Sequence, residues 1–263
     1  MLTRNLHKAR KAFKKRSVYD SVKAHKFMPK TSEEHKLEKG QYIKSLIYGG
    51  LDGIITTFAV VAGVSGASLS AGIVLILGFA NLFADGLSMG IGDFLSTKAE
   101  IEYQQAERER ELWEVEHYAE GERVEMIELY MEKGISKEDS EAMVGIISKY
   151  KDAWVDIMMV EELGIVVDKK SPLKNALVTF FSFAIFGFIP LLAYVLSSFI
   201  PVVQENTFLI AGILTGLTLF LLGTLKVLIT AKNWFVSGFE MLIVGGIAAF
   251  AAYGIGVLLA GLA

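Results

Sequence analysis

The sequence predicts an all-α membrane protein, and three observations support this fold class. Of the 263 residues, 52% are hydrophobic and the mean hydropathy is +0.44, too apolar for an ordinary soluble domain of this size. The charged residues, 21% of the chain, gather in an N-terminal tail and one central block. Between and after these regions lie apolar stretches long enough for the roughly 20 residues that a membrane-spanning helix needs.

Residues 1–44 form a basic tail with 13 Lys and Arg against 4 Asp and Glu. The tail lacks the apolar core and small-residue cleavage site of a secretory signal, so we expect a cytosolic tail instead. The first two spans follow within residues 45–96, from Leu46 to Gly66 and from Leu69 to Leu95. Three further spans are predicted within residues 173–263, at 175–200, 207–230 and 235–263.

The central block, residues 97–172, holds 20 acidic and 10 basic residues and reads as three helices. The first is predicted over 99–132, since that stretch has strong helix formers and no Pro. Gly134 is expected to end the first helix, and Ser136 to cap a second helix over 137–149. A third helix is predicted over 152–163, and Lys169–Pro172 connects it to the next span. Because Lys and Arg are retained on the cytosolic side, the tail and this block are expected in the cytosol.

The glutamates of the block have helical spacing. Glu107, Glu111 and Glu114 lie at i, i+4 and i+7, and Glu122 and Glu125 repeat the pattern at i+3. A divalent cation between such like charges would remove their repulsion, and carboxylates without thiols favour Fe²⁺, Mn²⁺, Mg²⁺ or Ca²⁺. The alternative is a solvated acidic face neutralised within the helix by Arg108, Arg110 and Arg123. The chain has no cysteine, which excludes thiolate metal sites.

Ionisable residues within the spans are the stronger functional signal, because each costs at least about 2.5 to 3.5 kcal/mol to insert. Asn81, Asp85, Met89 and Asp93 recur at every fourth position and so form one stripe along the second span. Asp52 lies between Gly50 and Gly53 in the first span. We interpret Asp52, Asp85 and Met89 as an ion path, whereas Asp93 and Glu240 are expected at the membrane interface. Close helix packing is predicted at the glycine pairs of the spans.

Two segments resemble the signature helices of the vacuolar iron transporter family. They are Gly50-Leu-Asp-Gly-Ile-Ile-Thr-Thr-Phe-Ala-Val-Val-Ala-Gly63 and Ala84-Asp-Gly-Leu-Ser-Met-Gly-Ile-Gly-Asp-Phe-Leu-Ser96. The resemblance extends through Ala153–Gly164 and the last three spans, and so covers about residues 40–263. It implies a homodimer of five-helix protomers, a cytosolic three-helix metal-binding domain, and exchange of Fe²⁺ for protons across the membrane of an acidic organelle.

The resemblance also implies roles for individual residues. The pathway residues would be Asp52 and Met89, and the metal-binding residues of the central block would be Glu111, Glu114, Glu122, Glu125 and Glu162, with Met158 and Met159 nearby. Two positions depart from the family pattern, because Asn81 stands where many relatives have a glutamate and Ser45 where they have an acidic residue. Asp85 is our candidate for the missing proton-coupling carboxylate.

The sequence therefore predicts a transporter that moves Fe²⁺ out of the cytosol, with Mn²⁺ and Zn²⁺ as alternative ions. Its predicted partners are divalent ions, protons, lipid and a second copy of the chain, with no nucleic acid and no permanently bound cofactor. A membrane-anchored metal store or sensor is the alternative function. An iron-oxidising enzyme is not expected, because carboxylate-bridged iron oxidases use two Glu-x-x-His motifs and this chain has a single one, from Glu114 to His117. The membrane is that of a vacuole or similar acidic organelle in a eukaryote, or the plasma membrane in a prokaryote.

Overall fold

The structure is a computed structural model that describes residues 11–13, 15–24, 37–166, 171–230 and 233–262. The chain divides into two units, residues 1–43 and 44–263. The first unit includes the short helix α2 (Val18–Ala24) and the first residues of the next long helix, which begins at Leu37. Much of the predicted basic tail, Lys169 and Lys170 of the predicted joint, and Lys232 between the last two spans lie outside the described residues.

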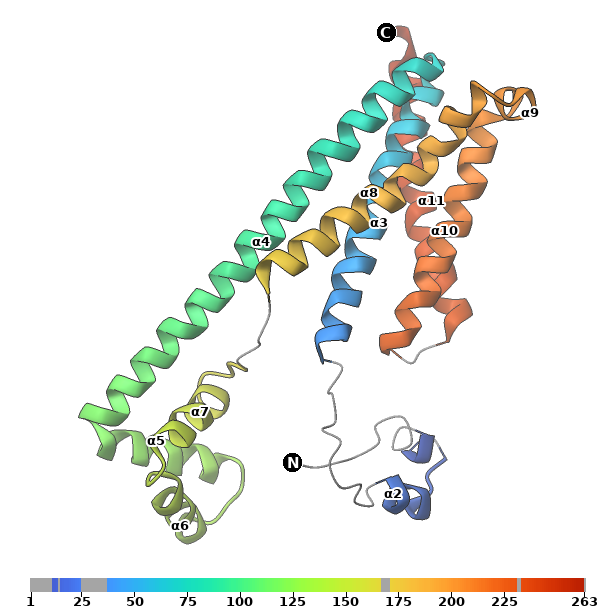
Figure 1. Cartoon of the computed structure of the whole chain (residues 1–263). Helices are drawn as coiled ribbons and strands as arrows, with labels where there is room; N and C mark the ends of the chain where they lie inside the picture. Colours follow the sequence, from blue (N-terminus) through green and yellow to red (C-terminus); the bar gives the residue numbers. More distant parts are fainter. Residues whose placement is uncertain (1–10, 14, 25–36, 167–170, 231–232, 263) are drawn as a thin grey trace. The chain divides into compact units, whose positions relative to one another are not determined.

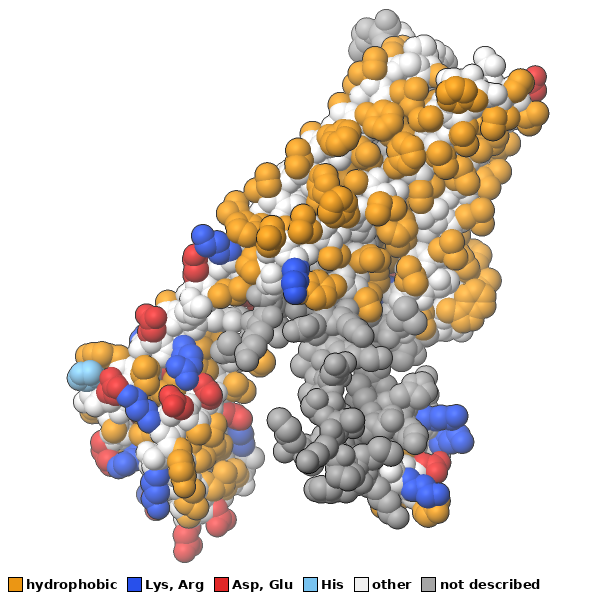
Figure 2. All heavy atoms as spheres, in the orientation of Figure 1, with side chains coloured by type: hydrophobic (Ala, Val, Ile, Leu, Met, Phe, Trp, Pro, Cys, Tyr) orange, Lys and Arg blue, Asp and Glu red, His pale blue; other side chains and the backbone are white. Residues whose placement is uncertain are grey.

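Among the described residues, five helices are long and apolar enough to cross a membrane, which confirms the five predicted spans (Figure 1). They are α3 (Leu37–Gly66), α4 (Ala71–His117), α8 (Pro172–Ser197), α10 (Thr207–Thr230) and α11 (Trp234–Leu259). A short helix, α9 (Pro201–Glu205), joins α8 to α10, and one 3₁₀ turn, η1 (Ala260–Leu262), follows α11. Figure 2 shows hydrophobic side chains covering the surface of the long helices, as expected of a face in contact with lipid.

Helix α4 extends far beyond the predicted end of the second span. Its 47 residues measure about 70 Å at 1.5 Å per residue, more than twice the roughly 30 Å of a bilayer core. The apolar part ends near Leu95, but neither Gly nor Pro occurs from Phe94 to His117, so nothing breaks the helix. The prediction of a separate helix over 99–132 was therefore wrong. Its first half continues α4, and its second half is α5 (Ala119–Glu132).

The break between α4 and α5 occurs at Tyr118, which has a non-helical backbone with φ −136° and ψ 47°. The aromatic ring of Tyr118 lies against Gly121, where any Cβ atom would collide with it. Gly121 thus permits the turn. The chain then continues through α6 (Lys137–Ile147) and α7 (Lys151–Glu161), which confirms a second and third helix after α5.

The start of α6 follows the predicted stop and cap. Gly134 has φ +89°, a left-handed conformation that glycine adopts without strain. The hydroxyl of Ser136 accepts a hydrogen bond from the backbone N–H of Asp139 at 3.2 Å and so caps the helix. The helices then enclose an apolar core of eight buried residues: Val115, Met126, Tyr130, Val144, Trp154, Val155, Met158 and Met159. This core fixes α5, α6 and α7 against the last turns of α4.

Glycines allow the spanning helices to approach to backbone contact, as predicted. A Cβ atom on Gly49 would lie 2.6 Å from the carbonyl oxygen of Thr179, and Gly53 meets the backbone of Phe183 in the same way. Helix α3 therefore packs directly on α8. At its other end, Gly63 meets Gly256 of α11. Helix α4 also packs along α8, so α8 is the common support for both helices that bear the predicted path.

Candidate metal centre and polar stripe

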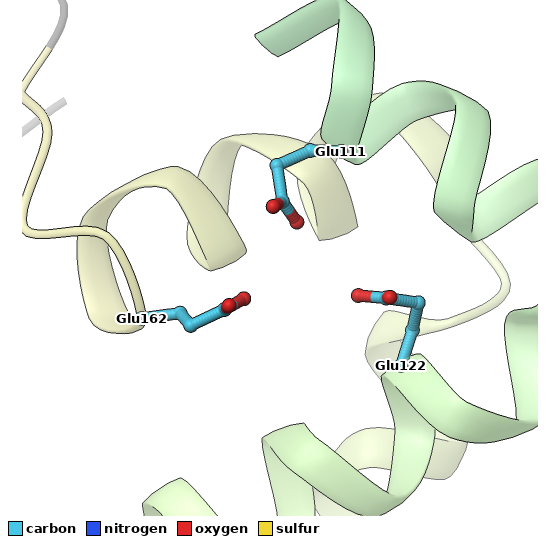
Figure 3. A group of neighbouring side chains, drawn as sticks. All are labelled: Glu111, Glu122 and Glu162. Atoms are coloured by element: carbon cyan, nitrogen blue, oxygen red, sulfur yellow. The ribbon is translucent and has the colours of Figure 1, made fainter. Parts of the chain in front are cut away.

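Three glutamate side chains from three helical segments converge beside the core of α4 to α7. Glu111 lies on α4, Glu122 on α5, and Glu162 directly follows α7 (Figure 3). One carboxylate oxygen from each lies within 4.8 Å of the others. Glu111 is fully buried and Glu122 is 4% exposed, whereas Glu162 is exposed. This arrangement offers three hard oxygen ligands with one side open to solvent.

Two oxygens of this cluster are buried without a hydrogen-bond partner among the described residues. They are Oε2 of Glu111 and Oε2 of Glu122. A buried acceptor that is left unpaired costs about 1 to 3 kcal/mol, and more when it is charged. A cation bound among the three carboxylates would satisfy both oxygens at once. The unpaired oxygens therefore point to a ligand for which the cluster is shaped.

The electrostatics of the cluster match this geometry. Burial raises the pKa of Glu111 to about 7, and the charge of Glu162 adds to the shift. Burial and then the charge of Glu111 raise the pKa of Glu122 to about 7. The pKa of Glu162 is raised as well, first by partial desolvation and then by Glu125. The cluster therefore holds its protons near neutral pH until an ion of opposite charge displaces them.

Glu114 and Glu125 lie at the rim of the cluster. Neither belongs to the group of three, but the charges of both raise the pKa of Glu111 and of Glu122. Glu125 is exposed and Glu114 is half-buried. Met158 and Met159, by contrast, are 0% and 1% exposed and belong to the apolar core. A ligand role for either thioether stays a prediction.

The arginines of α4 and α5 differ in their partners. Arg110 contacts Glu107, Glu111 and Glu114, and Arg123 contacts Glu120, so both pair within the helix or its next turn as expected. For Arg108, the intrahelical partner that the alternative interpretation expected is wrong. Its guanidinium instead donates to Oδ1 of Asp156 at 3.0 Å, and so links α4 to α7. Sequence spacing misses this link because the two residues are 48 positions apart.

The predicted membrane stripe lies on one side of α4. Asn81, Asp85 and Met89 are all half-buried, next to the buried glycines that pack on α8. On α3, Asp52 is also half-buried, and its charge interacts with that of Asp85. Asn81 Nδ2 donates to Thr56 Oγ1 at 3.4 Å, which joins the two helices. Asp52, Asp85 and Asn81 therefore belong to one polar patch formed by α3 and α4.

The carboxylates of Asp52 and Asp85 have no hydrogen bond or ion pair from any side chain that the structure describes. Asp93, one turn beyond Met89, differs because it accepts hydrogen bonds from Thr179 at 2.5 Å and Thr97 at 3.3 Å. Its interhelical bond to Thr179 of α8 was missed from the sequence, where only the four-residue spacing marked it. Glu240 is exposed and pairs with Lys226 at 3.0 Å.

The structure is that of a multi-pass membrane protein with five candidate spans. Two of the spans carry carboxylates, and one of them continues into an acidic helical region that could bind a cation. The VIT family model matches residues 43–257, and the chain belongs to this family. This confirms the resemblance found in the sequence. The family is one of transporters, so the chain is not an enzyme.

Three relatives illustrate the similarity. The chain is 41% identical to a vacuolar iron transporter of Toxoplasma gondii, with 97% of this chain and 89% of the relative aligned. It is 39% identical to a vacuolar iron transporter of Plasmodium falciparum, over 98% of each. It is 34% identical to vacuolar iron transporter 1 of Arabidopsis thaliana, over 84% of this chain and 88% of the relative.

Proposed function

We propose that this protein transports ferrous iron out of the cytosol, through its five spans and in exchange for protons, into an acidic compartment of the vacuolar type. The observation on which the proposal depends is the pair of carboxylates, Asp52 and Asp85, that neighbour one another within apolar helices and lack a protein partner in the described structure. Two such acids within a bilayer cost free energy unless a bound cation compensates their charge. The names of the relatives supply iron as the cargo.

In this proposal the chain has four regions. A cytosolic basic tail (1–44) precedes the first two spans (45–96), a cytosolic metal-binding domain follows (97–172), and the last three spans complete the chain (173–263). The domain captures Fe²⁺ on Glu111, Glu122 and Glu162, with Glu114 and Glu125 attracting the ion to the rim. The convergence of three carboxylates and the two unpaired buried oxygens support this role.

The polar patch on α3 and α4 is half-exposed in a single chain, although it lies within apolar helices. We propose that a second copy covers it, so that the pathway runs along the seam of a homodimer. Asp52 and Met89 would then bind the passing ion. The unpaired state of Asp52 and Asp85 supports this arrangement, because an acid facing lipid has no compensating partner.

The ligand types favour Fe²⁺ among common divalent ions. A thioether is a poor ligand for the hard ions Ca²⁺ and Mg²⁺, so Met89 would select against both. Mn²⁺ and Zn²⁺ also accept carboxylate ligands and are the alternative cargoes. On the acidic side of the membrane, protonation of Asp52 and Asp85 would release the ion and return protons to the cytosol. Asp85 is the proposed coupling residue, in the place of the glutamate that Asn81 replaces.

Uptake of Fe²⁺ into proteoliposomes tests the proposal directly. We expect Asp52→Ala to reduce uptake to the level of empty vesicles while Fe²⁺ binding at the cluster of Glu111, Glu122 and Glu162 is unchanged. Glu240→Gln is the matched control, because Glu240 is also an acid of a span but is exposed and paired with Lys226, and its uptake should stay close to wild type. Full uptake by the Asp52 variant would exclude Asp52 from the pathway. An uptake rate that is the same with and without a pH gradient would exclude proton exchange.

A membrane-anchored metal store or sensor is the second candidate, because the carboxylate cluster is assembled within one chain and needs no second copy. The same proteoliposomes separate the two functions. A store binds Fe²⁺ without accumulating it in the vesicle lumen, whereas a transporter fills the lumen until the gradient is balanced.

A further inference from the structure

Arg110 contacts more members of the acidic region than any other cation that the structure describes. Its Nη2 lies 2.9 Å from Oε1 of Glu111 and its Nη1 lies 2.7 Å from Oε2 of Glu114. Its Nε lies 3.0 Å from Oε2 of Glu107. Arginine presents its donors in a rigid planar fork, so the three contacts are made at once without rearrangement. One guanidinium is thus bound to one buried carboxylate of the cluster and to one carboxylate at its rim.

Because of the contact with Arg110, the two oxygens of the Glu111 carboxylate differ in their hydrogen bonding. Oε1 accepts from Arg110, whereas Oε2 is buried and unpaired. The charge of Arg110 is also the cationic influence that opposes the raised pKa of Glu111 and of Glu162. Glu122, the third member, has no comparable cation and its Oε2 is unpaired as well. The cluster is therefore neutralised on one side only.

We propose that Arg110 is an affinity-setting residue of the metal centre, a fixed counter-charge that shares Glu111 and Glu114 with the bound ion and keeps capture weak enough for release. The inference rests on the proposed function of the cluster and adds to it a residue that binds no metal. A divalent ion at the unpaired oxygens would lie close to a permanent positive charge that cannot be lost by deprotonation. Repulsion between the two cations lowers the affinity for metal, and the burial of Glu111 and Glu122 reduces the screening of this repulsion by solvent.

A weak site has a use in a transporter. An ion that is held too tightly by the soluble domain never reaches the membrane, as conduction requires binding that is favourable enough for entry and weak enough for exit. Five carboxylates around one dication, Glu111, Glu114, Glu122, Glu125 and Glu162, would otherwise bind it with a large excess of negative charge. Arg110 reduces that excess while leaving Oε2 of Glu111 and Oε2 of Glu122 unpaired.

The experiment measures Mn²⁺ affinity, as an air-stable probe, by titration calorimetry of the full-length protein in detergent at pH 8. We expect Arg110→Gln to bind Mn²⁺ about tenfold more tightly than wild type, since one nearby positive charge has been removed. Arg110→Lys keeps the charge and should return the affinity to within about threefold of wild type. The gain in Arg110→Gln should shrink as salt is raised, because the opposing charge is electrostatic and partly exposed.

Arg123→Gln is the matched control. It removes the same type of residue from the same region, but Arg123 contacts exposed Glu120 and the face of Trp154 and none of the three converging carboxylates. Its Mn²⁺ affinity should equal that of wild type. Equal or weaker binding by Arg110→Gln, with Arg110→Lys no closer to wild type, would overturn the inference and leave Arg110 a structural residue. Absence of Mn²⁺ and Fe²⁺ binding in wild type would instead overturn the metal centre itself.

Discussion

The acidic residues at the end of α4 and on α5 to α7 and those of the apolar spans differ in what surrounds them. Glu111, Glu122 and Glu162 come from three helical segments of one chain, and an apolar core holds them together. Asp52 and Asp85 lie on two adjacent spans, half-buried and without a protein partner among the described residues. The first group is assembled within one chain and has one side open to solvent, whereas the second would, in the proposed dimer, be one half of a surface shared with a second copy.

This difference suggests a division of labour. Converging carboxylates with raised pKa values can hold an ion at equilibrium, which suits capture from the cytosol. A line of separated acids with few partners can pass an ion along without a deep energy minimum, which suits movement across a membrane. Variants in one group should therefore change binding, and variants in the other should change transport.

The largest expected effect of a single change among the three converging glutamates is the loss of metal binding in Glu111→Gln. The amide keeps the shape of the side chain but removes the charge of the only fully buried member of the three converging glutamates. We expect Mn²⁺ affinity to fall on the order of 100-fold, about 2.7 kcal/mol, while transport at high Fe²⁺ persists in part. Calorimetry and proteoliposome uptake measure the two quantities. Complete loss of transport with intact binding would contradict the division.

Glu128→Gln is a suitable control for that measurement. Glu128 lies on α5, the helix that carries Glu122, but does not belong to the converging group, so the Glu128→Gln variant should bind Mn²⁺ as wild type does. If both variants lost affinity equally, the overall negative charge of the domain would explain binding better than a defined site.

A smaller effect is expected from pH. Glu111 and Glu122 have a pKa of about 7 in the folded protein against an ordinary value of 4.5, so the metal-free cluster binds protons near neutrality. Metal must displace these protons, and affinity for Mn²⁺ should fall about tenfold from pH 7.5 to pH 6.5 and change little above pH 8. A profile that is flat between pH 6 and pH 8 would contradict the raised pKa values.

The same shifts determine the pH dependence of stability. Because the folded pKa of each acid is raised, its contribution to stability is fully present below pH 4.5 and is lost as pH rises through 7. The metal-free domain should therefore unfold more easily at pH 8 than at pH 5.5, and added Mn²⁺ should restore stability mainly at pH 8. Fluorescence of Trp154, which lies in the core of this region, reports the transition.

The spans could be predicted from the sequence because lipid demands long apolar stretches, and composition alone reveals them. The start of α6 was also predictable, since the turn at Gly134 and the cap at Ser136 depend on these residues and their immediate neighbours alone. The prediction from sequence missed the continuation of α4 to His117, although neither Gly nor Pro occurs between Phe94 and His117. Charged composition suggested a boundary where the backbone has none.

The candidate site was only partly accessible to the same reasoning. Helical spacing placed Glu111 beside Glu114 and Glu122 beside Glu125, but the structure brings together Glu111, Glu122 and Glu162 instead. Local periodicity describes one helix, whereas convergence depends on how three helices pack around Trp154 and the methionines. The link from Arg108 to Asp156 is missed for the same reason. Contacts between helices that are distant in sequence are the part that the tertiary structure supplies.

The smallest expected effect concerns that link. Arg108 is 35% exposed, and its ion pair with Asp156 joins α4 to α7, whose end is followed by Glu162. Arg108→Ala should lower the stability of the region from the end of α4 to α7 by at most about 1 kcal/mol, the usual range for exposed ion pairs, and weaken Mn²⁺ binding a few fold. Lys98→Ala is the control, because Lys98 pairs only with Glu102 of its own helix among the described contacts. Urea unfolding and calorimetry measure both effects. If the two variants behaved equally, the core alone would position α7, and Arg108 would contribute nothing to the cluster of converging glutamates.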